Sequence, residues 1–277
     1  MQKDVFRSIQ QIVHDRSGID LKEGKAQMVS ARISRRLREL QLQSEQDYLD
    51  FLRKDTNEIV QLLNVISTNV TRFFREKAHF EFTTGVLKSW LNEGQDKLRI
   101  WSAASSTGQE PYSLLMTIAE TLRQARRACD YRLLGTDIST RVLEKAESGS
   151  YDNDEIEGIP PDLLRRYFDK TAGGHQVKQS LRDHAVFRRM NLNEPPFPMQ
   201  GPLDMVFCCN VMIYFNAETK RRLLTDIHRL LRPDGFLVVS HTESLTGLTD
   251  LYRPVQPSIY AKADAPAHVG VQTEQSQ

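Results

Sequence analysis

The stretch LRIWSAASSTGQEPY, residues Leu98 to Tyr112, decides how the chain folds. An apolar run typical of a buried strand gives way to small residues, turns at Gly108 and continues into a helix with Pro111 in its first turn. This order is typical of the first strand, loop and helix of a nucleotide-binding α/β sheet, where ligands bind at the carboxyl ends of the strands. Considered alone, an ordinary strand–helix turn explains the stretch equally well.

The glycine pattern of this loop narrows the choice of ligand. Only Gly108 is present, so the G-x-G-x-x-G fingerprint of dinucleotide-binding enzymes is missing, and Glu110 stands where a phosphate would rest. A carboxylate at that place repels a pyrophosphate and suits a ligand with a cationic end, such as the ammonium and sulfonium of S-adenosylmethionine. A nicotinamide-dependent dehydrogenase is therefore the least favoured enzyme class.

From Leu98 onward, short apolar runs alternate with amphipathic helical patterns. Such alternation predicts a mostly parallel sheet that is covered by helices on both faces. The pair Gly173-Gly174 is typical of a hairpin and predicts a small antiparallel β insert over about residues 168–190. The expected strands are 98–104, 131–135, 185–187, 203–209, 236–240 and 258–262, and the expected helices are about 111–126, 139–147, 160–168 and 217–231.

The chain divides into a helical part and an α/β part. Residues 1–66 carry apolar positions at helical spacing and predict a small all-α domain, which a linker and connecting helix at 67–90 join to the rest. Residues 91–262 hold the alternation of strands and helices. The polar tail 263–277 is expected to be disordered.

The composition argues against several classes of protein. Among 277 residues, Lys and Arg exceed Asp and Glu by a net charge of +1, which argues against a protein that coats nucleic acid through bulk charge. No apolar run approaches the roughly 18 residues of a membrane-spanning helix. The cysteines, Cys129, Cys208 and Cys209, make a poor disulfide set because two are adjacent, so we expect a cytoplasmic protein.

Three further segments place polar residues where a ligand would bind. Asp137 ends the strand that follows the first loop, where an acidic residue can accept hydrogen bonds from both ribose hydroxyls. Taken alone, helix capping explains Asp137 better, but together with the first loop ribose binding is favoured. Asn210 ends another hydrophobic run, and Tyr214 lies one turn of chain further on. The segment before the sheet supplies polar residues that packing does not obviously require: Asn69, Thr71 and Arg75.

Three long motifs then occur in order: residues 68–76 (TNVTRFFRE), 101–113 (WSAASSTGQEPYS) and 207–215 (FCCNVMIYF). Together they resemble the chemotaxis receptor methyltransferases, the CheR family, and the resemblance extends over about residues 1–262. It implies a class I S-adenosylmethionine-dependent methyltransferase fold, which is a Rossmann-like α/β fold with an antiparallel last strand. It also implies methylation of glutamate side chains on the cytoplasmic helices of methyl-accepting chemotaxis receptors, which yields glutamyl methyl esters and S-adenosylhomocysteine.

The resemblance implies a role for each candidate residue. Glu110 would face the ammonium end of the methionine moiety, Asp137 would face the ribose, and Tyr214 would be the catalytic residue near the point of methyl transfer. No metal is implied. The other expected cofactor-binding residues are Asn69, Thr71 and Arg75 on the linker side, Asn191 and Leu192 beside the adenine, and Asn210 and Val211 along the methionine.

Two residues depart from the usual pattern of the family. Gln109 replaces a glutamate that is common before Glu110, and Cys209 stands where an arginine is frequent before Asn210. Neither change removes a group that we expect to bind the cofactor, but both change the charge around it.

Arginines are concentrated on the second predicted helix, at about residues 25–42. Arg32, Arg35 and Arg36 share one flank at the spacing i, i+3 and i+4. Receptor helices present several carboxylates, so a cationic helix face would steer the encounter. We therefore expect the substrate to contact Arg32, Arg35, Arg36 and Arg38, although an ordinary solvated helix face also explains these residues.

Two other functions remain open at this point. A nucleic-acid methyltransferase would use the same pocket and grip phosphates with the arginine helix, although the near-neutral charge counts against it. A non-catalytic sensor or scaffold that binds S-adenosylmethionine would keep Glu110, Asp137 and Asn210 without methyl transfer. We expect no nucleic-acid partner, no insertion into a membrane and a monomer.

Overall fold

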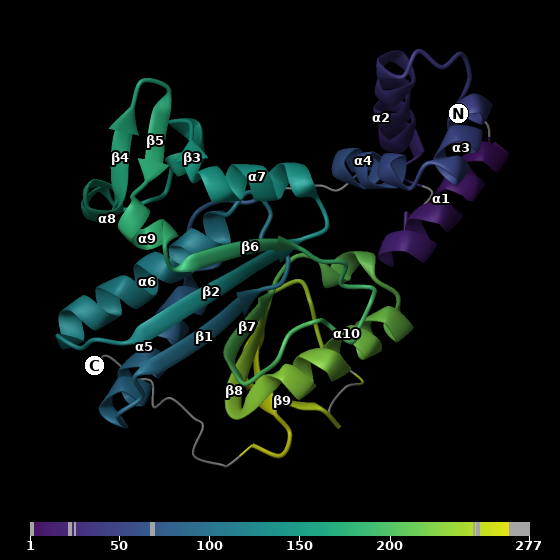
Figure 1. The fold of residues 1–277 in the computed structure, drawn as a ribbon. Helices are drawn as coiled ribbons and strands as arrows, with labels where there is room; N and C mark the ends of the chain where they lie inside the picture. Colours follow the sequence, from purple (N-terminus) through teal and green to yellow (C-terminus); the bar gives the residue numbers. More distant parts are fainter. Residues whose placement is uncertain are drawn as a thin grey trace.

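The computed structural model describes residues 3–21, 24, 26–66, 70–245, 247 and 250–265. They form a small helical domain and a larger α/β domain, and the helical domain lies beyond the end of the sheet toward which the arrows of β2 and β6 point (Figure 1). The helices of the small domain are α1 (Lys3–Ser17), α2 (Ala26–Glu39), α3 (Glu45–Lys54) and α4 (Thr56–Ile66).

The helical domain has a hydrophobic core of its own. Apolar residues four positions apart, such as Ile9 and Val13 on α1 and Val29 and Ile33 on α2, fall on one face of each helix and are fully buried. The start of α3 is fixed by Ser44, because its hydroxyl accepts a hydrogen bond from the backbone N–H of Asp47 at 3.1 Å. The predicted all-α N-terminal part of the fold is confirmed.

The larger domain is built on a sheet in which seven of the described strands follow the order β6-β2-β1-β7-β8-β10-β9. From β6 to β8 all neighbouring strands are parallel, whereas β10 runs antiparallel to both β8 and β9. The prediction of a mostly parallel sheet with an antiparallel last strand is confirmed. The strands are β1 (Lys97–Ser102), β2 (Asp130–Asp137), β6 (Ala185–Arg189), β7 (Leu203–Cys208), β8 (Leu231–Val239), β9 (Tyr252–Gln256) and β10 (Ile259–Lys262).

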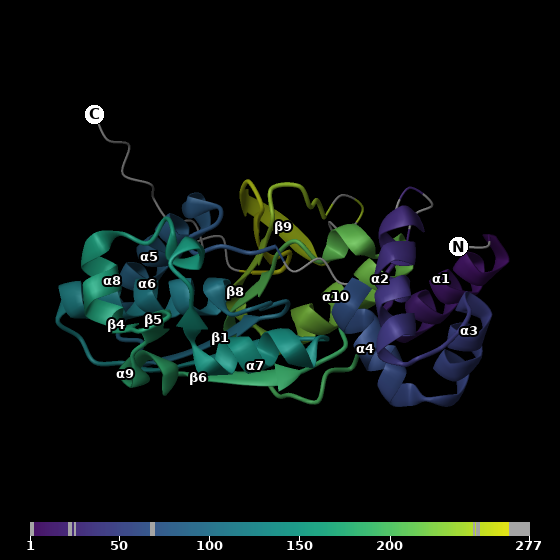
Figure 2. The same cartoon turned by 90° about the horizontal axis from the view of Figure 1, so that it is seen from above.

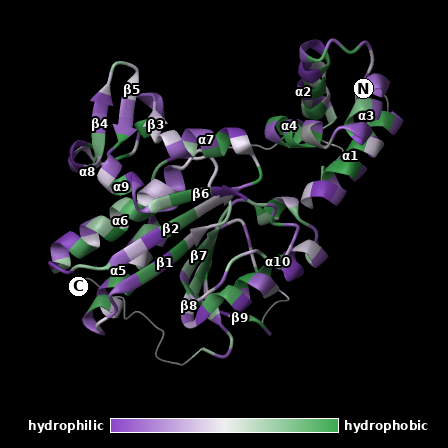
Figure 3. Ribbon diagram, viewed as in Figure 1, coloured by the Kyte–Doolittle hydropathy of each residue, from purple (hydrophilic) through white to green (hydrophobic). Residues whose placement is uncertain are grey.

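Different helices cover the two faces of this sheet. Side chains alternate along a strand, so Leu98 and Ile100 of β1 join a core with α5 and α6, while Trp101 joins a second core with α10. The interior strand β7 and the second half of β8 carry mostly hydrophobic residues because both of their faces are buried (Figure 3). The covering helices are α5 (Lys77–Asn92), α6 (Gln109–Ala125), α7 (Thr140–Ser148) and α10 (Ala217–Leu230).

The small β insert differs from the prediction in its boundaries. It is a three-stranded sheet with the order β3-β5-β4, so it includes the short strand β3 that was not predicted. The predicted insert also extended too far, because Ala185–Arg189 pairs in parallel with β2 and belongs to the main sheet. The ring of Phe187 on that strand packs directly against Gly135 of β2. A Cβ atom at position 135 would lie 2.6 Å from the ring, which leaves room only for glycine. The insert elements are β3 (Ser150–Tyr151), η2 (Asp154–Ile156), α8 (Pro161–Tyr167), β4 (Phe168–Thr171), β5 (Gly174–Val177) and α9 (Gln179–Arg182).

Two more features complete the fold. The edge strand β9 was not predicted, and it contains Pro254, a residue that cannot donate to a sheet and is tolerated at an edge. Figures 1 and 2 both show the insert and the helical domain at opposite ends of the molecule.

Within the described residues, no helix is both long enough and apolar enough to span a bilayer. Of the predicted disordered tail, residues 266–277 lie outside the described residues.

Candidate active site

A cavity of about 460 Å³ opens at the carboxyl ends of β1, β2 and β7, between the sheet and the helical domain. The loops after these three strands supply one wall, the segment 70–76 supplies a second, and residues of α1, α2 and their connection supply a third. Every candidate cofactor residue within the described part of the chain lines this cavity, and so does Tyr214; Asn69 lies outside the described residues. The residues brought together are Thr71, Arg75, Glu110, Asp137, Asn191, Leu192, Asn210, Val211 and Tyr214.

The loop after β1 places Glu110 at the cavity. Gly108 adopts a φ of +95°, and a Cβ atom there would lie 2.7 Å from the hydroxyl of Tyr151, so only glycine fits the turn. Glu110 then falls in the first turn of α6, where its carboxylate accepts a hydrogen bond from the hydroxyl of Ser102 at 2.7 Å. Burial raises the pKa of Glu110 to about 7, and the carboxylates of Glu76 and Glu243 act in the same direction.

The loop after β2 holds Asp137 in a different way. Its two carboxylate oxygens accept backbone N–H hydrogen bonds, one from Ser106 at 3.0 Å and one from Ser139 at 2.9 Å. Asp137 therefore ties the loop after β1 to the start of α7 while it also faces the cavity. Burial raises the pKa of Asp137, although these N–H groups oppose the rise. The helix cap itself is Ser139, whose hydroxyl accepts the N–H of Val142.

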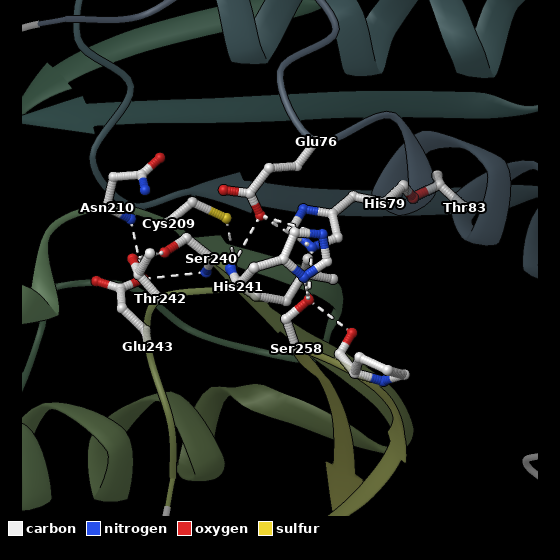
Figure 4. A network of polar contacts seen from close by, with 12 residues as sticks. Glu76, His79, Thr83, Cys209, Asn210, Ser240, His241, Thr242, Glu243 and Ser258 are labelled. Carbon is white, nitrogen blue, oxygen red and sulfur yellow. Dashed lines mark hydrogen bonds and ion pairs between the residues drawn. The ribbon is translucent and has the colours of Figure 1, made fainter.

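The loop after β7 carries Asn210 and Tyr214, and Glu243 holds it in place. Asn210 has a φ of +60°, an unusual conformation for a residue with a side chain. The buried carboxylate of Glu243 accepts N–H groups from Asn210 at 2.9 Å and Ser240 at 3.0 Å (Figure 4). It also accepts the N–H of Ile213 at 3.2 Å. Sequence reasoning missed Glu243, although its place just after β8, at the same edge of the sheet, is the signal that could have found it.

A second polar network joins the linker to the loop after β8. The carboxylate of Glu76 accepts the backbone N–H of His241 at 3.1 Å and lies 3.4 Å from Nε2 of His79 (Figure 4). Ser258 bridges the two imidazoles, at 2.8 Å from His79 and 3.1 Å from His241. Burial lowers the pKa of His79 to about 4, and His241 acts in the same direction, so the His79 ring is neutral at pH 7. The network fixes the linker against the sheet.

The linker also packs against the α/β domain through its aromatic residues. Phe73 is buried and makes an edge contact with Tyr151 at a centroid distance of 5.0 Å. The backbone N–H of Phe74 donates to the hydroxyl of Ser113 on α6 at 3.0 Å. These contacts confine Thr71 and Arg75 to the cavity wall.

The helical domain closes the cavity on its remaining side. The backbone N–H of Asp20 donates to the carbonyl of Tyr214 at 2.8 Å, and the amide of Asn191 donates to the carbonyl of Arg16 at 2.7 Å. The same amide also donates to Glu194, and its oxygen accepts the N–H of Asn193. The backbone carbonyl of Asn191 in turn accepts the N–H of Glu194 at 3.1 Å, so this residue is held firmly at the cavity wall.

Comparison with known proteins agrees with this architecture. The family model described as "CheR methyltransferase, SAM binding domain" matches residues 69–261, and "CheR methyltransferase, all-alpha domain" matches residues 4–67. The chain belongs to the CheR methyltransferase family. The resemblance seen in the three motifs is thereby confirmed, and so is S-adenosylmethionine as the cofactor, since the family's main domain is defined by binding it.

Relatives of this CheR family member match over almost their whole length. The chemotaxis protein methyltransferase of Escherichia coli (strain K12) is 38% identical, with 92% of this chain and 90% of that protein covered. Chemotaxis protein methyltransferase 2 of Pseudomonas aeruginosa is 37% identical, with 94% of each chain covered. The chemotaxis protein methyltransferase of Borreliella burgdorferi is 34% identical, again with 94% of each chain covered.

The four arginines of α2 have different environments. Arg36 makes an ion pair with the buried carboxylate of Glu58 at 2.6 Å, and Tyr48 donates to the same carboxylate at 2.8 Å. Hydrogen bonding to Glu58 raises the pKa of Arg36. Arg32 donates to the carbonyl of Ile66 at the end of α4. The exposed arginines of this helix are Arg35, which pairs with Glu39 at 2.9 Å, and Arg38.

Proposed function

We propose that this CheR family methyltransferase transfers the methyl group of S-adenosylmethionine to glutamate side chains on the cytoplasmic helices of chemotaxis receptors. The products are glutamyl methyl esters and S-adenosylhomocysteine. The single observation that carries the proposal is the convergence of Glu110, Asp137 and Asn210, from the loops after three neighbouring strands, in one cavity. The name of the relatives, chemotaxis protein methyltransferase, supports the choice of substrate.

The residues of the cavity fit the cofactor. Within the described residues, the carboxylate of Glu110 has a hydroxyl partner but no ion pair, so a cationic group beside it would stabilise its ionised form. Each oxygen of Asp137 keeps a lone pair for a ribose hydroxyl. The other proposed contacts come from Asn69, Thr71, Arg75, Asn191, Leu192, Asn210 and Val211.

The chemistry requires orientation more than proton transfer. The sulfonium, when bound, supplies an activated methyl group whose departure leaves a neutral thioether. A glutamate carboxylate, with a reference pKa of about 4.3, is already ionised and needs no general base. The chain then has to align the acceptor with the donor, which can contribute up to about 7–11 kcal/mol, and to exclude water. Tyr214 is our proposed catalytic residue, since its loop is fixed by Glu243 and Asp20 at the cavity.

Helix α2 supplies the charge that would attract acidic receptor helices. Arg35 and Arg38 are exposed, so we propose that they steer the substrate together with the partly buried Arg32. For Arg36 we propose a structural role, because Glu58 already occupies its guanidinium. In this proposal the protein acts in the cytoplasm as a monomer.

The experiment that tests the proposal uses methyl-labelled S-adenosylmethionine with membranes that contain chemotaxis receptors. After incubation, the receptor band is treated with alkali and released methanol is measured. We expect base-labile label, because carboxyl esters hydrolyse in alkali. Base-stable label would instead indicate methylation of nitrogen, and cofactor binding without any transfer would indicate a sensor or scaffold.

A further inference from the structure

The mouth of the cavity carries exposed hydrophobic side chains. Among the described residues, the large hydrophobics that remain exposed are Val70 at 76%, Ile213 at 45% and Val186 at 40%. Single exposed hydrophobics are ordinary, but Val70 and Ile213 both line the one cavity described above, although they are far apart in sequence. Both therefore place an exposed apolar side chain in the lining of the same cavity.

Both rim residues sit on backbone that is held in place. The carbonyl of Val70 accepts a hydrogen bond from the guanidinium of Arg75 at 3.0 Å. The N–H of Ile213 donates to Glu243, and its neighbour Tyr214 is tied to Asp20. The two side chains are thus presented to solvent by fixed segments, which lowers the cost of ordering when a partner binds.

A positive charge accompanies the two apolar side chains. Arg72 also lines the cavity and is exposed, and no carboxylate in the described part of the chain pairs with it. Neighbouring Arg75 differs, since it is only partly exposed and bonds to Val70. An exposed guanidinium in the same cavity lining as two exposed apolar side chains matches a partner surface that is both acidic and apolar.

We propose that Val70, Arg72 and Ile213 form a docking rim for the methyl-accepting segment. The matching partner is an acidic amphipathic helix. An apolar residue one helical turn from the reacting glutamate packs against Val70 and Ile213, and Arg72 faces the acidic side of the helix. This inference rests on the proposed function. It adds the residues that would determine which glutamate of the receptor is methylated.

The first test measures methylation kinetics with a soluble cytoplasmic fragment of a chemotaxis receptor. The double variant V70A/I213A is expected to raise KM for the fragment roughly tenfold, as the loss of apolar contact area predicts. The R72E variant is expected to raise KM as well, and high salt should reduce that effect. Affinity for S-adenosylhomocysteine, measured by calorimetry, should stay unchanged in both variants. The matched controls are V186A, an exposed valine on β6, and R126E, an exposed arginine at the end of α6.

The second test is a double-mutant cycle across the interface. In receptor fragments, serine replaces the apolar residues one helical turn from the modified glutamate. These fragments are assayed with the native enzyme and with V70A/I213A. We expect the two losses to be less than additive, because both changes remove the same contact.

The outcomes separate the two proposals. An unchanged KM in the rim variants, additive losses in the cycle, or reduced affinity for S-adenosylhomocysteine would each overturn the docking rim while native methylation stands. Absence of methyl transfer by the native chain would overturn the proposed function and the rim with it.

Discussion

The loops after β1 and β2 each bring a carboxylate into the same cavity, yet they hold it in different ways. Asp137 accepts two backbone N–H groups, which favour its ionised form, although burial still raises its pKa. Glu110 accepts a hydroxyl from Ser102, and the neighbouring carboxylates of Glu76 and Glu243 oppose its ionisation. The difference indicates that Asp137 belongs to the framework, whereas the anion of Glu110 has side-chain hydrogen bonds alone and would be stabilised further by a cation beside it.

The largest expected difference concerns stability. Asp137→Ala leaves two buried N–H groups without a partner and should lower the free energy of unfolding by about 2–4 kcal/mol. Glu110→Gln removes a buried charge whose ionisation the site disfavours and should leave the free energy of unfolding unchanged or slightly raised. Denaturant unfolding of the cofactor-free protein measures both, with Asp169→Ala on an exposed strand as the control. An equal loss in the Glu110 and Asp137 variants would remove the distinction between the two carboxylates.

The Glu110 variant, which should barely change stability, should clearly weaken cofactor binding. Glu110→Gln keeps the size of the side chain but removes the charge that we place beside the ammonium group, so affinity for S-adenosylmethionine should fall about 10- to 100-fold. Calorimetry measures the change, and Glu144→Gln on the exposed face of α7 is the matched control. Affinity that matches the control would contradict the assigned role of Glu110.

The pH dependence sharpens the comparison further. Since the pKa of Glu110 is raised to about 7, the cofactor-free protein loses stability as the pH rises from the unfolded pKa near 4.5 through 7. Ligand affinity runs the other way, because the ionised form binds the cation. Between pH 6 and pH 8 affinity for S-adenosylhomocysteine should rise about tenfold, in step with the ionised fraction. Glu110→Gln should abolish most of this rise; a native protein whose affinity is flat over that range would argue against the raised pKa.

The smallest expected effect lies outside the cavity, on α2. Reversing the exposed residues Arg35 and Arg38 to glutamate should raise KM for receptor about three- to fivefold at low ionic strength, and 0.5 M salt should remove most of the difference. Cofactor affinity serves as the internal control and should not move. Arg36 is left intact because its pair with Glu58 is buried. Receptor kinetics that do not respond to the reversal would leave α2 as an ordinary solvated helix.

Much of the fold could be predicted from local pattern. The alternation of apolar runs and helical periodicity predicts the parallel sheet, and the spacing of Val29 and Ile33 predicts the buried face of α2. Strand partners could not be predicted in the same way. The segment 185–189 reads as part of a hairpin insert, and only its parallel pairing with β2, including Phe187 opposite Gly135, shows that it extends the main sheet.

Site residues could be predicted where a polar side chain follows the end of a strand. Glu110, Asp137 and Asn210 stand just after apolar runs, so their sequence positions indicate the cavity edge. The position of Glu243 just after β8 could have indicated the same edge, but its partners, the backbone N–H groups of a distant loop, could not be predicted from the sequence. The structural role of Arg36 could not be distinguished from the roles of the other α2 arginines either, because its partner Glu58 lies on α4.

The central claim is that a cationic methyl donor sits beside Glu110, and calorimetry in two buffers of different ionisation enthalpy tests it most directly. Titration of the native chain with S-adenosylmethionine at pH 7 should show one binding site and the release of about half a proton, as Glu110 becomes fully ionised. The Glu110→Gln variant should release almost none. No uptake of the donor, or uptake with the same proton release in both proteins, would contradict the account.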